Sequence, residues 1–184
     1  MRPVSVRPWA LRVLLTLLLI PPMAGAQVAQ PEYRVLDTGR TGTMQKELQE
    51  AADNGYRLVE GQGSWLLSAI LEKTTGEAEP IEYLLLATSR SGTMQKEMDG
   101  ASAQGYRFAS VLGIGQEVII AVQRAKGMTT RTHAQLLLAT SKIGTMEKEL
   151  LAEASKGFRF VGQTFFERSF GGPEYVAILE RPIR

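Results

Sequence analysis

Apolar and polar positions follow two periods along this chain, and the same succession occurs three times. In its first copy, a short apolar run at residues 33–36 precedes a segment in which Met44, Leu48 and Ala51 fall on one helical face. A glycine follows, then residues that alternate between apolar and polar, then a last run that is apolar at most positions. Each unit is therefore predicted to fold as strand–helix–strand–strand.

The repeated motif Gly-Thr-Met-Gln/Glu-Lys-Glu marks the three copies most clearly. It stands at residues 42–47, 92–97 and 144–149. A period of about fifty residues is typical of repeat architectures, in which units that are too small to fold alone bury apolar surface against one another. We expect the three repeats to form one compact domain, with the following bounds: 32–73, 82–124 and 134–181.

The strand patterns predict how each sheet is ordered. The third strand is nearly all apolar while the second alternates, which favours a central place for the third. The order 1-3-2 makes the first and second strands parallel, joined by a right-handed helical crossover. We therefore predict an α+β fold of three tandem βαββ repeats, packed about a pseudo-threefold axis with sheets inward and helices outward.

Cap residues are predicted at both ends of each helix. The threonine of the motif is the N-cap by residue type (Thr43, Thr93, Thr145), although Gly42 as the N-cap would place Gln45 favourably at the third helical position. A left-handed glycine is expected just past each C-terminus, at Gly55, Gly105 and Gly157.

Residues 1–26 have the three parts of a secretory signal peptide. Arg2, Arg7 and Arg12 give a basic start, an apolar run occupies residues 13–20, and Ala24-Gly25-Ala26 forms a small-x-small cleavage site. We expect a secreted or periplasmic protein beginning at Gln27, with no transmembrane segment once the signal is removed. An uncleaved anchor is the alternative, but the apolar run is shorter than the roughly 20 residues that span a bilayer.

Charge and cysteine content then exclude several classes of protein. The formal net charge is +2, with 21 basic and 19 acidic residues. Three of the basic residues lie in the signal, so the remainder carries 18 against 19 and has a net charge of −1. No basic excess is left to favour nucleic-acid binding. The chain has no cysteine, which excludes disulfides, thiolate catalysis and cysteine metal sites.

Short motifs in each repeat resemble a small bacterial domain family with no assigned activity. Residues 32–35, Glu-Tyr-Arg-Val, resemble its E-Y-K-V first strand, and residues 55–59, Gly-Tyr-Arg-Leu-Val, resemble its Gly-Trp-Glu-Leu-Val second strand. The third strand of that family ends in Lys or Arg, as it does here at Lys73, Arg124 and Arg181. Tyr or Phe replaces Trp, and Arg replaces Glu. The resemblance implies a strand–helix–strand–strand fold and no particular chemistry.

No catalytic, metal or cofactor site is predicted. The single histidine, His133, falls in an expected linker and has no cysteine or second histidine to work with. The loop before each helix combines small residues with a cation, which is typical of an anion cradle or of a plain strand-to-helix connection. Its cations are Arg40, Arg90 and Lys142.

A second candidate anion site is the arginine that opens each alternating strand. If a pseudo-threefold axis brings them together, Arg57, Arg107 and Arg159 would converge and bind an anion. At the periphery, each would instead pair with the acid of its own helix, and this is the favoured interpretation. Those acids are Glu47, Glu97 and Glu149.

Three phenylalanines of the third repeat have no counterparts in the others: Phe165, Phe166 and Phe170. An exposed member would mark a partner surface. The absence of a catalytic constellation favours a non-enzymatic binding or scaffold protein of the cell envelope, with a protein or small-molecule partner. The alternative is a small-ligand binder, of an anion for example, that uses the repeat loops or the pseudo-threefold axis.

Overall fold

The computed structural model describes residues 30–64, 66–76, 78–168 and 172–183. All of these residues except Gln30 belong to one compact unit, Pro31–Arg184. The expected signal peptide, its cleavage site and Phe170 lie outside the described residues. None of the described helices has the length and apolar content needed to cross a bilayer.

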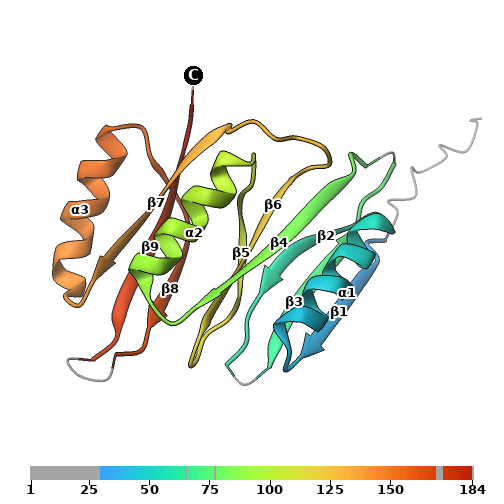
Figure 1. Ribbon diagram of the computed structural model, residues 1–184, viewed down its shortest axis with the longest axis horizontal. Coiled ribbons are helices and arrows are strands. Elements are labelled where there is room, and N and C mark those ends of the chain that lie inside the picture. The colour runs from blue at the N-terminus through green and yellow to red at the C-terminus, as the bar shows by residue number, and fades with distance from the viewer. Residues whose placement is uncertain (1–29, 65, 77, 169–171, 184) are drawn as a thin grey trace, which may run out of the picture. The chain divides into compact units, whose positions relative to one another are not determined.

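Three strand–helix–strand–strand units follow one another in this part of the chain (Figure 1). The first comprises β1 (Tyr33–Thr38), α1 (Thr41–Asp53), β2 (Tyr56–Gly61) and β3 (Leu67–Lys73). The second comprises β4 (Ile81–Thr88), α2 (Ser91–Ala103), β5 (Arg107–Gly113) and β6 (Val118–Ala125). The third comprises β7 (His133–Thr140), α3 (Ile143–Ser155), β8 (Arg159–Phe166) and β9 (Glu174–Pro182). His133 is thus the first residue of a strand, and its prediction as a linker residue was wrong.

Each repeat has its own three-stranded antiparallel sheet, and the predicted order is confirmed in all three. The orders are β1-β3-β2, β4-β6-β5 and β7-β9-β8. The second strand of every repeat is irregular near its start, where the register shifts after Leu58, Phe108 and Phe160. A bulge of this kind leaves a residue outside the regular ladder and re-aims its neighbours.

The helices begin two residues before the predicted N-caps. Arg40, Arg90 and Lys142 occupy the N-cap position, and none of them makes a side-chain capping bond. The threonine at the end of each preceding strand instead accepts a hydrogen bond from the N-cap amide, at 3.1–3.4 Å. Thr43, Thr93 and Thr145 are therefore third helical residues, and Thr145 donates its hydroxyl to the carbonyl of Lys142.

The predicted helix C-termini are confirmed. Gly55, Gly105 and Gly157 have φ of +83°, +89° and +89°, the left-handed conformation that a Cβ disfavours. In each case the amide of the glycine donates to a carbonyl of the last helical turn.

The hydrophobic core is shared between neighbouring repeats. One cluster joins Met44 and Leu48 of α1 to Tyr83 of β4 and Leu112 of β5. A second joins the corresponding residues of α2 to the third repeat, including Phe166, which is 3% exposed. No repeat therefore completes its core alone.

The contacts between repeats run in chain order and do not close about an axis. α1 packs on β4 and α2 on β7, while β2 contacts β5 and β5 contacts β8. Closure would place α3 on β1 in the same way. Instead α3 buries none of its side chains, and Val35 of β1 is 64% exposed. The predicted pseudo-threefold packing is not seen, and α1 and α2 lie at repeat boundaries rather than on an outer surface.

Candidate functional site

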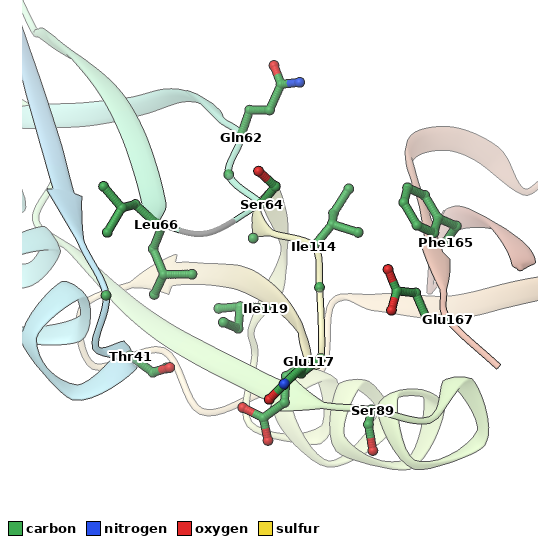
Figure 2. A pocket seen from close by; sticks show the side chains of 16 residues that line it. Thr41, Gln62, Ser64, Leu66, Ser89, Ile114, Glu117, Ile119, Phe165 and Glu167 are labelled. Atoms are coloured by element: carbon green, nitrogen blue, oxygen red, sulfur yellow. The ribbon is translucent and has the colours of Figure 1, made fainter. Parts of the chain in front are cut away.

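An open cleft of ≈ 1140 Å³ lies where the turns of the repeats come together, and we call it the turn cleft (Figure 2). It is formed by the β2–β3 and β5–β6 turns, by the loops before α1 and α2, and by the end of β8. All three repeats therefore contribute to it. The side chains labelled in Figure 2 are Thr41, Gln62, Ser64, Leu66, Ser89, Ile114, Glu117, Ile119, Phe165 and Glu167.

Glycines allow the first two repeats to approach closely beside this cleft. A Cβ on Gly113 would lie 2.5 Å from Cδ2 of Leu67, and one on Gly61 would overlap Leu112. The amide of Ile114 donates to the carbonyl of Gly63 at 2.8 Å, which ties the two turns together. The wall of the cleft between these turns is thus held by this backbone hydrogen bond and by the side chains of Leu67 and Leu112, which pack against the glycines.

The lining combines apolar surface with neutral and acidic polar groups. Leu66 is 51% exposed, and Phe165 is half-buried at the other side. Hydroxyl and amide groups come from Thr41, Ser64 and other polar residues, and the charged groups of the described lining are the carboxylates of Glu117 and Glu167. Such a surface suits a neutral or cationic ligand with an apolar part, and it disfavours an anion.

The second strands hold their arginines apart from one another. Arg57 donates to the carbonyls of Ala52, Tyr56 and Glu79. Arg107 pairs with Glu180 of the third repeat at 3.3 Å. Arg159 is exposed at the start of β8. No shared contact brings the three together.

The favoured pairing of these arginines with the acids of their own helices was also wrong. Arg57 binds carbonyl oxygens, and the carboxylate that Arg107 reaches belongs to β9, 73 residues away, rather than to α2. Across the described part of the chain, Glu47, Glu97 and Glu149 form no ion pair with them.

The cations of the strand-to-helix loops are exposed at the N-cap positions. Arg40 borders a shallow depression of ≈ 520 Å³ together with Lys46, Glu47 and Glu50. The two cations there face two carboxylates, so the depression has no net positive charge. Arg90 and Lys142 occupy the same place in α2 and α3.

Two buried polar side chains, those of Glu180 and Tyr83, connect neighbouring repeats away from the turn cleft. Glu180 is 3% exposed and accepts a hydrogen bond from the Phe108 amide at 2.7 Å. Tyr83 plays the corresponding part between the first two repeats, where its hydroxyl accepts from the Leu58 amide at 2.9 Å. Burial raises the pKa of Tyr83 above its usual value, so the phenol stays neutral. These groups stabilise the packing of neighbouring repeats.

The described residues include no group of three or more potential metal ligands. The glycines at 61, 63, 113 and 115 are typical of tight turns, but nothing in the sequence places the turns of separate repeats side by side.

Comparison with known proteins gives no relative: no family model matches the chain, and searches of curated proteins and of solved structures find no match.

Proposed function

We propose that this protein is a non-enzymatic binding module of the cell envelope, secreted or periplasmic, and that the turn cleft takes its ligand. The observation that supports this most is that turns of the first two repeats and the end of β8 in the third line one open, partly apolar hollow. Ligand sites of proteins are concave, mostly apolar, and carry a few polar groups that fix orientation.

The chemistry of the cleft narrows the class of ligand. Glu117 and Glu167 favour a cationic group, while Leu66 and Phe165 offer apolar contact at the two sides. The ligand is therefore an amine or other cation attached to an apolar group, as in a peptide or small molecule. Anion binding at the strand-to-helix loops is the alternative, and the depression beside Arg40 and Lys46 is where it would occur.

Three titrations followed by NMR amide shifts separate these two functions. Phenylalaninamide, a cation, is expected to shift the resonances of Ser64, Ile114 and Glu117, with a Kd of about 1 mM or weaker for so small a ligand. N-acetylphenylalanine, which has the same ring and a negative charge, is expected to leave them in place. Inorganic phosphate tests the alternative through the amides of Arg40 and Lys46.

Matched variants test the role of charge. Glu117→Gln is expected to weaken phenylalaninamide binding about two- to fivefold, the worth of one partly exposed charge pair. Glu47→Gln removes a carboxylate outside the cleft and is expected to change nothing. Two results would overturn the proposal. One is equal binding of phenylalaninamide and N-acetylphenylalanine, and the other is a shift of the Arg40 amide with phosphate while no ligand shifts the resonances of the turn cleft.

A further inference from the structure

The same helix-on-strand contact is built twice in this chain. Gln45 of α1 donates through Nε2 to the Tyr83 carbonyl at 2.8 Å and accepts from the Leu85 amide at 2.7 Å. Gln95 of α2 does the same to β7, with the Gln135 carbonyl and the Leu137 amide, at 3.2 and 2.7 Å. Each glutamine thereby satisfies two backbone groups on the free edge of the next sheet.

A second link accompanies each contact. In the second strands of the first two repeats, an amide beside the bulge donates to a buried side chain of the next repeat. The Leu58 amide donates to the Tyr83 hydroxyl, and the Phe108 amide donates to the Glu180 carboxylate. The boundary between repeats thus has two halves. One half is formed by the helix and the bulged second strand of a repeat, and the other by the first strand of the next repeat and the strand paired with it.

Within the described part of the chain, each end of the series leaves one of these halves uncovered. On β1, Tyr33 and Val35 take the places of Tyr83 and Leu85, yet they are 56% and 64% exposed, whereas Tyr83 is 3% exposed. At the other end, Leu151 of α3 and Phe160 of β8 are 66% and 55% exposed. Met44 and Leu48 of α1 are fully buried, whereas their counterparts Met146 and Leu150 are only half-buried.

We propose that α3 and β8 of one molecule dock on β1 of a second copy of this chain, head to tail, and so continue the series of repeats between molecules. Two complementary halves of one established contact are displayed by the same chain, which is why the occupant is a second copy. The Tyr33 hydroxyl would accept from the Phe160 amide, as the Tyr83 hydroxyl accepts from that of Leu58. Such a contact is heterologous, and it leads to a closed ring or an open filament.

One substitution makes this contact weaker than those within the chain. Glu147 of α3 stands where α1 and α2 have glutamine. Its carboxylate can accept from the Val35 amide but has no proton to donate to the Tyr33 carbonyl. One of the two hydrogen bonds that each glutamine makes is therefore missing, so the association is expected to be reversible and dependent on concentration.

Sedimentation velocity over a series of concentrations tests the proposal. The protein is expressed from the full-length sequence and purified after any processing that its own cell carries out. The wild type is expected to associate as concentration rises. Val35→Arg alters the β1 half and Leu151→Glu the α3 half. Both positions are exposed, and a circular-dichroism melt checks that both variants fold. Each variant alone is expected to stay monomeric.

Mixing the two variants gives the decisive readout. Val35→Arg retains an unaltered α3, and Leu151→Glu retains an unaltered β1. Only these two surfaces can then associate, so an equimolar mixture is expected to form 1:1 dimers and nothing larger. Glu147→Gln is expected to tighten association about fivefold by restoring one hydrogen bond. Leu66→Glu, in the turn cleft, serves as the control and is expected to associate like the wild type.

Three results would overturn the proposal. They are a wild type that stays monomeric at every concentration, a mixture that behaves like its separate components, and association that survives either single substitution.

Discussion

At the scale of single residues, each helix is followed by a glycine whose backbone lies in the left-handed region. Gly55, Gly105 and Gly157 have φ of +83°, +89° and +89°, and a helix that turns directly into a strand commonly needs one such residue.

The three glycines differ in what surrounds them, which makes a graded prediction possible. Replacement by alanine is expected to lower the free energy of unfolding by roughly 1–2 kcal/mol at each, because a Cβ is strained at positive φ. Gly105→Ala should be the worst, since its Cβ would also lie 3.1 Å from the Thr130 carbonyl oxygen. Gly55→Ala should be the mildest, with Lys73 Cε as its nearest neighbour at 3.8 Å.

Urea unfolding of the three variants measures this order. Three variants with the stability of the wild type would show that the left-handed conformation is not required at these positions.

These glycines could be predicted from the sequence because the requirement for positive φ is local to a helix end. The partner of Arg107 could not be predicted, because Glu180 is 73 residues away and belongs to another repeat. No local pattern encodes a contact of that kind.

At the scale of elements, the strand–helix–strand–strand unit and its 1-3-2 order followed from hydrophobic periodicity alone. The helix starts did not, because Arg40, Arg90 and Lys142 lack the side chains that usually mark an N-cap. A strand-end threonine supplies a hydrogen bond there in their place. The contacts of Gln45 and Gln95 could not be predicted either, because the helical period indicates which face of a helix is polar but not what covers that face.

Gln45 and Glu147 occupy the same place in α1 and α3, which provides a matched pair of substitutions. Gln45→Ala is expected to lower the free energy of unfolding by about 1–3 kcal/mol, because it leaves the half-buried amide of Leu85 and the carbonyl of Tyr83 without partners. Glu147→Ala on dilute protein is expected to change it by less than about 0.5 kcal/mol.

Chemical denaturation of both variants side by side provides the comparison. Losses of equal size would mean that the glutamine contributes through its helix alone and not through the next sheet.

At the scale of the whole molecule, the sequence identified three equivalent units but not the operation that relates them. Similar units can close about an axis or continue in series, and the choice depends on which faces fit. Here the helix of one repeat fits the first strand of the next, as Gln45 and Gln95 show, so the series has two unlike ends. The turn cleft follows from the same packing, because it exists only once neighbouring turns lie together.

Native-state amide hydrogen exchange on dilute protein tests this serial packing most directly. The amides of Leu85 and Leu137 are bound by the glutamines of the preceding helices, while Val35 has the same place on β1 with none of the described helices against it. We expect the first two to exchange at least about 100-fold more slowly than Val35. Exchange at Leu85 and Leu137 as fast as at Val35 would contradict the account, since it would mean that neighbouring repeats do not hold one another through these contacts.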